Sequence, residues 1–313
     1  MKQLSKSFIV VCGIVRNSEK GLKKNIPVIN SLCDKAQDYK VVIYENDSKD
    51  NTKQILKKWQ DDRSSDKIHI SLNEGLISGK TIPSSKDLFC NPFFSRKRIE
   101  KMVFFRNQYL SYLRTMNWTP DYVFVVDLDV ETLFLDSILS SFSSDTEWDA
   151  ITAYGYSLSP YLRRRYHDAY ALVELGEENE PQTEKKIKKR ASKYSKICCG
   201  DALVRVFSAF GGLAIYRYEA IKNIEYQLIF NNDNRVEVYC EHYSLYFQMK
   251  KNGYDRVYIN PNMYLKYQAV TLKIIFKTLI RTGESIFMYL KNISQHHFSI
   301  CSKIKNNNIL DGK

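Results

Sequence analysis

The first seventy residues switch repeatedly between two hydrophobic periods, and this constrains the fold more than any other feature. Residues 8–15, 41–44 and 68–72 are short runs rich in valine and isoleucine, which is typical of buried strands. Between them, over residues 21–37 and again around Trp59, apolar residues recur at helical spacing. The order β-α-β-α-β predicts a parallel sheet whose ligands bind at the carboxyl ends of the strands.

The rest of the chain continues as alternating strands and helices. The expected elements are a helix at 98–116, a strand ending at 126, a helix at 134–142, a strand at 148–153, two strands around a turn at 204–216, a helix at 240–252 and a strand at 254–261. Residues 73–97 are expected to be a loop. Residues 160–200 carry runs of charge, and we expect an insertion that is mobile or becomes ordered only with a ligand. The fold class is therefore α/β, with a mixed, mainly parallel central sheet flanked by helices.

A basic charge balance limits the partners. The 313 residues carry a formal net charge of +12, and 44% of them are apolar. The apolar fraction supports a substantial core. The excess of positive charge indicates a polyanionic partner, which can be nucleic acid, an anionic membrane surface or a phosphorylated substrate.

Cysteines and apolar runs indicate the compartment. The seven cysteines are an odd number without C-x-x-C spacing, so we expect reduced thiols in a cytosolic protein. Residues 8–15 imitate the apolar part of a signal peptide, but Arg16 and Asn17 follow directly and no small-x-small cleavage pattern is present. We therefore expect a buried first strand there. No apolar run reaches the ~20 residues that span a bilayer.

Residues 269–313 form a second expected unit, after a main domain at 1–268. Apolar residues recur there at helical spacing, and Lys273, Lys277 and Arg281 are four apart, so they lie on one helix face. A basic amphipathic helix of this kind can lie on anionic lipid. The alternative is that its apolar stripe packs on the main domain and its basic residues are solvated.

Two aspartates follow the expected strand that ends at residue 126. Alternate strand positions face the same way, so Asp127 and Asp129 share a direction. Neighbouring carboxylates repel each other unless a cation or a hydrogen-bonding ligand compensates. Mg²⁺ or Mn²⁺ carrying a diphosphate is the usual compensation, because hard cations prefer oxygen ligands. The alternative is an acidic turn in which Asp129 caps the following segment.

Polar residues also follow the first two strands. Glu45, Asn46 and Asp47 come after the second strand, where a carboxylate can accept hydrogen bonds from a ribose hydroxyl or a base N–H. The same residues can instead cap the next helix. Arg16 leaves the first strand at the same edge of the sheet, so it either contacts a nucleotide or lies in a surface turn.

The order of these motifs resembles the cryptococcal mannosyltransferase (capsule-associated protein) family, whose members are glycosyltransferases with the GT-A fold. The resemblance spans about residues 8–265. The matching segments are Glu45–Thr52, Phe105–Leu110, Val126–Asp129, Trp148–Asp149, Phe210–Tyr216, Cys240–His242 and Ile259–Pro261. The resemblance implies a GT-A-like, Rossmann-related domain at 1–268 and transfer of mannose from GDP-mannose to an α-linked product.

The resemblance also implies roles for individual residues. Arg106 would hold a diphosphate, Asp127 would reach the ribose or the metal, and Asp129 would bind the metal. Glu241 would deprotonate the acceptor hydroxyl or bind the acceptor, although a retaining reaction needs no such base. His242 would complete the metal shell, because imidazole suits Mn²⁺. The alternative for Glu241 and His242 is that they cap the helix they open.

Two roles are possible for Gly211 and Gly212. Without a side chain, they allow a sugar acceptor to approach the backbone closely. They can equally form a tight turn that needs a positive φ.

These expectations combine into a metal-dependent glycosyltransferase. It would move a hexose from a GDP- or UDP-sugar to a hydroxyl of a glycan or lipid-linked glycan, with Mn²⁺ or Mg²⁺ as cofactor. We expect it in the cytoplasm, peripheral on the inner face of a membrane. A sugar nucleotidyltransferase is the first alternative, but the Gly-rich phosphate loop it needs is absent at residues 12–17. A nucleic-acid-binding protein is the second; the acidic strand ends disfavour it, and we expect no nucleic acid partner.

Overall fold

The structure is a computed structural model that describes residues 2–73, 92–143, 145–158, 164–268 and 280. Its contacts divide the chain into two units, and the first, Met1–Ser157 with Arg164–Gln268, holds the fold described below. The basic helix expected at 269–313 lies outside the described residues apart from Ile280. The division at residue 268 therefore stays a prediction. Within the described ranges, no helix is long and apolar enough to cross a membrane.

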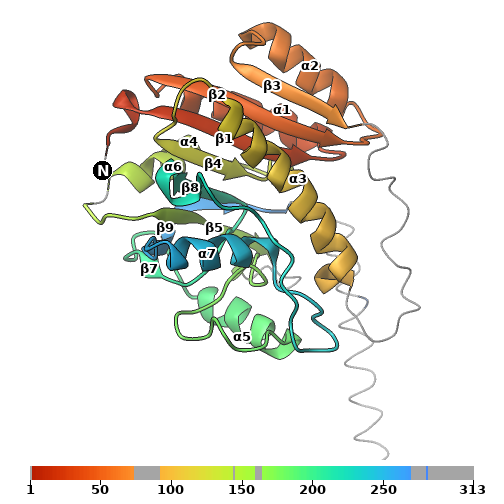
Figure 1. Cartoon of the computed structure of the whole chain (residues 1–313), viewed down its shortest axis with the longest axis vertical. Coiled ribbons are helices and arrows are strands. Elements are labelled where there is room, and N and C mark those ends of the chain that lie inside the picture. Colours follow the sequence, from red (N-terminus) through yellow and green to blue (C-terminus); the bar gives the residue numbers. More distant parts are fainter. Residues whose placement is uncertain (1, 74–91, 144, 159–163, 269–279, 281–313) are drawn as a thin grey trace, which may run out of the picture. The chain divides into compact units, whose positions relative to one another are not determined.

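One sheet of nine strands runs through the described residues (Figure 1). The strands are β1 (Phe8–Val15), β2 (Asp38–Asn46), β3 (Ile68–Asn73), β4 (Tyr122–Val126), β5 (Ala150–Leu158), β6 (Arg164–Tyr166), β7 (Val204–Arg205), β8 (Leu213–Arg217) and β9 (Val257–Lys266). Their order is β3-β2-β1-β4-β8-β5-β9-β7, and β6 pairs with β5. β1 is parallel to β2 and β4, whereas β8 is antiparallel to β4 and β5. The expected mixed, mainly parallel sheet is confirmed.

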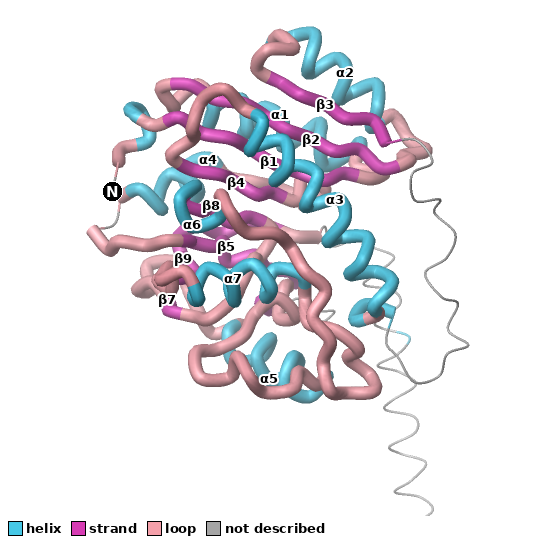
Figure 2. The backbone as a smooth tube through the Cα atoms, viewed as in Figure 1, coloured by secondary structure: helices cyan, strands magenta, loops and turns pink. Residues whose placement is uncertain are grey.

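Helices cover both faces of this sheet (Figure 2). The α-helices are α1 (Glu19–Cys33), α2 (Thr52–Arg63), α3 (Arg96–Thr115), α4 (Leu135–Leu139), α5 (Glu184–Tyr194), α6 (Tyr218–Ile221) and α7 (Glu241–Lys251). Three short 3₁₀ helices are η1 (Leu4–Lys6), η2 (Pro92–Phe94) and η3 (Ser140–Phe142).

Alternation along the strands builds two cores. In β1, Val10 and Cys12 are buried on the face covered by α3, α5, α6 and α7. Ile9 and Val11 are buried on the opposite face, which α1, α2 and α4 cover. Because both faces of the strand are covered, its sequence is a continuous apolar run rather than an alternating one.

The second half of the sheet differs from the expected strand–turn–strand at residues 204–216. β7 pairs with β9, while β8 inserts between β4 and β5, so the two strands are not neighbours. β9 also runs five residues beyond the expected end at Pro261, and its pairing with β5 shifts register after Ala153. These features depend on long-range pairing, which local sequence patterns do not record.

Residues 164–200 are folded, in contrast to the mobile insertion that we expected. α5 begins after Thr183, whose side chain caps the helix by accepting a backbone N–H. Ile187 and Tyr194 are buried in the larger core. Arg190 is buried too, and its guanidinium donates hydrogen bonds to a backbone carbonyl and to a glutamine side chain. The apolar residues of α5 are few but lie on one face, which is enough to dock a highly charged helix.

Candidate active site

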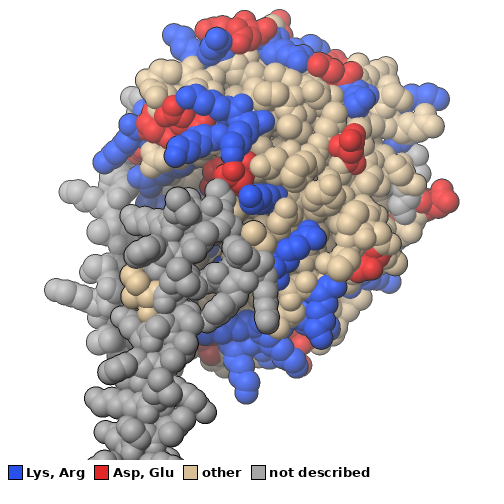
Figure 3. All heavy atoms as spheres, turned by 180° about the vertical axis from the view of Figure 1, so that it is seen from behind, with Lys and Arg blue, Asp and Glu red and all other residues tan. Residues whose placement is uncertain are grey.

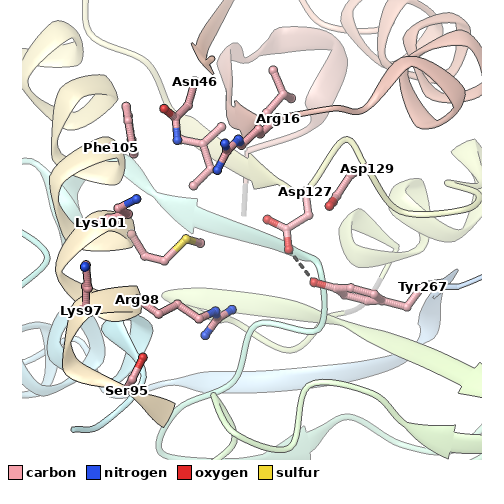
Figure 4. A pocket seen from close by; sticks show the side chains of 13 residues that line it. Arg16, Asn46, Ser95, Lys97, Arg98, Lys101, Phe105, Asp127, Asp129 and Tyr267 are labelled. Carbon is pink, nitrogen blue, oxygen red and sulfur yellow. Dashed lines mark hydrogen bonds between the residues drawn. The ribbon is translucent and has the colours of Figure 1, made fainter. Parts of the chain in front are cut away.

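A cavity of about 700 Å³ lies at the carboxyl ends of β1, β2 and β4, beside α3 (Figure 4). Its lining residues from the sheet side are Ile14, Val15, Arg16, Asn46, Asp127, Asp129 and Tyr267. Those from α3 and its cap are Ser95, Lys97, Arg98, Lys101, Met102 and Phe105. Four residues predicted from sequence are thus brought together: Arg16, Asn46, Asp127 and Asp129. The other predicted site residues do not line this cavity.

The loop that carries the two aspartates is held by α1. The buried side chain of Asn25 donates hydrogen bonds to the carbonyl oxygens of Leu128 (3.2 Å) and Val130 (2.8 Å). Gly21 lets the helix approach closely, because a Cβ there would lie 2.5 Å from the Leu128 carbonyl oxygen. The position of Asp129 is therefore set by a rigid helix rather than by a free loop.

The two carboxylates face the cavity in an unfavourable electrostatic environment. Desolvation at the cavity wall, and after it the charge of Asp127, raises the pKa of Asp129 to about 6, although the residue itself is exposed. Burial also raises the pKa of Asp127, against the opposing effect of Arg106. Among the described residues, no other residue donates a hydrogen bond to the Asp129 carboxylate. A ligand with positive charge would relieve this repulsion.

Tyr267 holds Asp127 in place. Its hydroxyl donates a hydrogen bond of 2.6 Å to Oδ2 of Asp127, and Figure 4 shows this contact at the cavity wall. The tyrosine ring is stacked on His167, with ring centroids 3.9 Å apart. On another side the ring lies against Gly212, where a Cβ would come within 2.9 Å of it. Packing and hydrogen bonding together leave the Asp127 carboxylate little freedom.

Basic residues of α3 form the opposite wall. Arg98, Lys101, Met102 and Phe105 are spaced 3, 4 and 7 residues apart, so they share one face of the helix, and Lys97 lies at its edge. Sequence reasoning did not identify Lys97, Arg98 or Lys101. The signal that could have found them is this spacing just after the expected loop.

Arg106, predicted to hold a diphosphate, lies behind the cavity wall. It is 1% exposed, and its Nε donates a hydrogen bond of 2.9 Å to Glu241. Its Nη2 lies 3.4 Å from Oδ1 of Asp127. The guanidinium also lies over the ring of Phe210, 4.9 Å from its centroid. Arg106 therefore neutralises acids beneath the site instead of meeting a ligand directly.

Glu241, predicted as the base or as an acceptor contact, is the main partner of this arginine. Burial raises its pKa, but Arg106 and, after it, weaker contributions from His242, Arg98 and a backbone N–H together lower the pKa of Glu241 to about 2. A carboxylate with so low a pKa accepts a proton poorly. The geometry assigns Glu241 to a buried ion pair.

His242, predicted as a metal ligand, is enclosed by aromatic rings. It stacks on Phe210 at 3.9 Å between centroids and meets Tyr226 edge-on at 5.6 Å. Burial lowers the pKa of His242 well below its ordinary value, so the ring is neutral. Within the described part of the chain, no three His, Cys, Asp or Glu side chains are arranged to hold a metal ion. The expected set of Asp127, Asp129 and His242 is therefore not brought together.

Only part of the polar turn after β2 reaches the cavity. Asn46 lines the cavity, whereas Glu45 is buried beside it. Oε1 of Glu45 accepts a hydrogen bond of 2.6 Å from the backbone N–H of Ser48, but the buried Oε2 has no hydrogen-bond partner within the described residues. Asp47 adopts a positive φ of 50°, which shapes the turn. The unpaired Glu45 oxygen is a buried acceptor next to the cavity.

Gly211 and Gly212 form a turn before β8, with φ of 67° and 90°. A Cβ on Gly211 would lie 2.0 Å from the Ala153 carbonyl oxygen. The alternative reading of a turn that requires positive φ is thus confirmed. Contact with an acceptor stays a prediction, since neither glycine lines the cavity.

Comparisons with known proteins place this site in a family. A family model described as cryptococcal mannosyltransferase 1 matches residues 9–248. No curated protein matches the chain.

Two solved structures show similarity at 14% sequence identity. The mannosyltransferase PcManGT from Pyrobaculum calidifontis, solved in complex with GDP-Man and Mn²⁺, has a TM-score of 0.46, and the match covers 85% of this chain and 58% of that one. The S. aureus TarS 1–349 structure has a TM-score of 0.44, with 87% and 63% covered. This chain thus spans about three fifths of the length of those two proteins.

The family match carries the assignment. Residues 9–248 make up more than three quarters of the 313 residues. They run from the second residue of β1 through most of α7 and include Asp127 and Asp129. The chain therefore belongs to the cryptococcal mannosyltransferase family.

Proposed function

We propose that the protein is a metal-dependent glycosyltransferase that moves a hexose from a nucleotide-sugar to a hydroxyl of a glycan or lipid-linked glycan. The observation that carries the proposal is the cavity, in which two carboxylates at a strand end face a basic wall on α3. This is the environment that a divalent cation and a diphosphate need together, because the carboxylates take the cation and the basic groups take the phosphates.

The nucleoside lies at the end of the cavity formed by β1 and β2. Ligands of such sheets bind outside the carboxyl ends of the strands. Arg16 and Asn46 line that end of the cavity, and the amide oxygen of Asn46 offers an acceptor for a ribose hydroxyl or a base N–H. Phe105 adds an apolar surface against which a base can pack.

The residues present fit Mn²⁺ or Mg²⁺. Asp129 has a carboxylate that is accessible from the cavity, receives no hydrogen bond from another described residue, and has a pKa raised to about 6. Asp127 stands beside it, with its orientation held by Tyr267 and Arg106. Two protein carboxylates are enough for a cation whose remaining ligands are phosphate oxygens and water. Such a cation supplies positive charge that favours departure of the nucleoside diphosphate.

The remaining residues bind and orient the donor. Arg16 and Lys101 line the cavity and provide donors for the phosphate oxygens of the nucleotide-sugar. Arg106 favours the ionised form of Asp127, since its charge opposes the rise in the Asp127 pKa caused by burial.

The family match and the cavity support a proposal for the donor sugar and for the course of the reaction. The family description names mannose, so we propose GDP-mannose as the donor. Asp127 and Asp129 are the carboxylates among the described lining residues, and both are assigned to the cation. A reaction without a separate carboxylate base therefore agrees with the cavity. The inner membrane face and the basic helix at 269–313 stay predictions.

A donor screen tests this function. Isothermal titration of GDP-mannose, UDP-glucose and UDP-N-acetylglucosamine, each with and without Mn²⁺, should show metal-dependent binding that is tightest for GDP-mannose. Release of nucleoside diphosphate then measures turnover. Absence of metal-dependent binding for every nucleotide-sugar would overturn the proposal, and tighter binding of a UDP-sugar would change only the donor.

A further inference from the structure

The cavity is longer than its nucleotide end, and its far end is basic. Figure 4 shows Arg16 and Asn46 near Phe105 at one end, and Ser95, Lys97 and Arg98 at the other. An α-helix rises about 1.5 Å per residue, so Lys97 lies about 12 Å along α3 from Phe105. The far end of the cavity thus lies away from the strand ends where the nucleoside is placed.

The cations at the far end form no ion pair with a described acid, and only Arg98 acts on one at longer range, where it helps to lower the pKa of Glu241. On the neighbouring face of α3, Arg96 forms an ion pair of 2.6 Å with Glu100, and such pairing is the common arrangement on this protein. Figure 3 likewise shows basic and acidic side chains interspersed on the face that it presents. No ion pair within the described ranges involves Lys97 or Lys101. Within the described part of the chain, Arg98 donates one hydrogen bond of 3.0 Å to the backbone carbonyl of Phe93 and lies over the ring of the same residue.

A count of charges shows that the donor does not use all of these cations. Arg16, Lys97, Arg98 and Lys101 line the cavity and carry four positive charges. The carboxylates of Asp127 and Asp129 are offset by the divalent cation proposed above. The two phosphates of a nucleotide-sugar carry one negative charge each and offset two of the four cations. Two positive charges are left over, and an unpaired charge concentrated in a cleft attracts an anion.

We infer that the Lys97 end of the cavity is an anion subsite for the acceptor, and that the acceptor carries a phosphate near the hydroxyl that is glycosylated. This inference rests on the proposed function, since it places the donor at the other end. Lys97 and Arg98 would bind the phosphate, and their unequal geometry suits it: one ammonium group as a point charge and one planar guanidinium. The phosphate can belong to the glycan itself or to a lipid carrier.

A binding experiment with two phosphate probes tests the inference. The wild-type chain is first saturated with Mn²⁺ and with GDP or UDP, whichever binds. Mannose, mannose 6-phosphate and farnesyl phosphate are then titrated. We expect at least one phosphate probe to bind about tenfold more tightly than mannose, because it gains two charge-assisted contacts. The tighter phosphate probe identifies the source, glycan for mannose 6-phosphate and lipid carrier for farnesyl phosphate.

Two variants on the same turn of α3 test whether Lys97 causes the preference for a phosphate probe. Lys97→Gln should abolish the tenfold preference while changing the affinity for the nucleotide less than twofold. Arg96→Gln is the matched control, because Arg96 is already paired with Glu100 and does not line the cavity; it should change neither affinity. Loss of nucleotide affinity in Lys97→Gln would show instead that Lys97 serves the donor and would overturn the inference.

The outcomes also distinguish failure of the acceptor subsite from failure of the proposed glycosyltransferase function. If neither nucleotide binds with Mn²⁺, the proposed function fails and the acceptor subsite fails with it. If a nucleotide binds but no phosphate probe is preferred over mannose, the donor site stands and only the phosphate-bearing acceptor is rejected.

Discussion

Two groups of acids meet on either side of one cavity wall, and their surroundings give them opposite properties. On the cavity side, Asp127 and Asp129 stand next to each other, and the pKa of Asp129 is raised to about 6. Behind the wall, Glu241 is bonded to Arg106, and its pKa is lowered to about 2. Arg106 is 2.9 Å from Glu241 but 3.4 Å from Asp127, and no cation among the described residues forms an ion pair with Asp129.

The difference in charge pairing indicates a different role for each group of acids. A buried carboxylate that is fully paired supports the structure, because removing its partner would leave an isolated charge in a low dielectric. A carboxylate pair without sufficient positive charge is maintained only where a ligand compensates, since otherwise it costs stability. This contrast supports the proposal that Asp127 and Asp129 bind the cation, whereas Glu241 stabilises the fold through its ion pair with Arg106.

The largest effect is expected from neutralising the cavity acid. Asp129→Asn keeps the size of the side chain but removes the charge that a cation needs, so turnover should fall about a thousandfold. The nucleoside diphosphate released from the donor measures it. Circular dichroism should show an unchanged fold.

The control for this variant is an acid elsewhere on the same domain. Asp136 lies on α4, is exposed and does not line the cavity, so Asp136→Asn should retain wild-type turnover. Equal losses in both variants, or full activity in Asp129→Asn, would remove Asp129 from the metal site.

The next effect concerns stability rather than activity. Glu241→Leu leaves Arg106 with only a long contact to Asp127 and should destabilise the fold by about 3 kcal/mol, as loss of one partner of a buried pair does. Urea unfolding measures it. The double variant Arg106→Met with Glu241→Leu removes both charges and should regain most of that stability. A double variant as unstable as the single one would show that the pair is not the reason.

The stability of the wild type at low pH tests the same ion pair of Arg106 and Glu241. The folded-state pKa of Glu241, about 2, lies below its ordinary value of 4.5, so the folded state favours the ionised form. The resulting stability is fully present above pH 4.5 and is lost as the pH falls toward 2. In Glu241→Leu this part of the acid sensitivity should be absent.

A smaller effect is expected at the residue that positions Asp127. Tyr267→Phe removes the 2.6 Å hydrogen bond but keeps the ring that stacks on His167, so metal-dependent nucleotide affinity should fall about tenfold. The matched control is Tyr264→Phe on β9, whose ring packs against Phe134 and does not line the cavity. Equal behaviour of the two variants would show that Tyr267 does not orient the site.

The first half of the fold could be predicted from sequence because its signals are local. β1 was expected at residues 8–15 and occupies Phe8–Val15, since a strand covered on both faces is a continuous apolar run. The position of β8 between β4 and β5 could not be predicted in this way. Antiparallel insertion of a late strand depends on partners far away in the chain.

The candidate site also has one part that could be predicted from sequence and one part that could not. Asp127 and Asp129 were predictable, because the end of a parallel strand fixes where they point. The face of α3 that meets the cavity was not. Successive helix residues differ by about 100°, so Arg106 lies on a different face from Arg98 and Phe105 although all three are on one helix. A list of basic residues cannot distinguish a ligand contact from a buried counter-ion without that orientation.

The smallest expected effect is a change in melting temperature at Asp129. It tests the comparison with Glu241 directly, because the charge of Asp129 should lower the stability of the protein while serving the proposed function. The folded-state pKa of Asp129, about 6, is above its ordinary value of 3.8, so the folded state binds a proton more tightly than the unfolded chain. Its charge therefore costs stability as the pH rises through 6, and below pH 3.8 the difference vanishes. With a chelator present, Asp129→Asn should raise the melting temperature by about 2 °C at pH 7.5 and leave it unchanged at pH 3.5. Mn²⁺ with nucleotide should stabilise the wild type but not the variant. A variant less stable than the wild type at pH 7.5 would mean that Asp129, like Glu241, already has its partner within the protein.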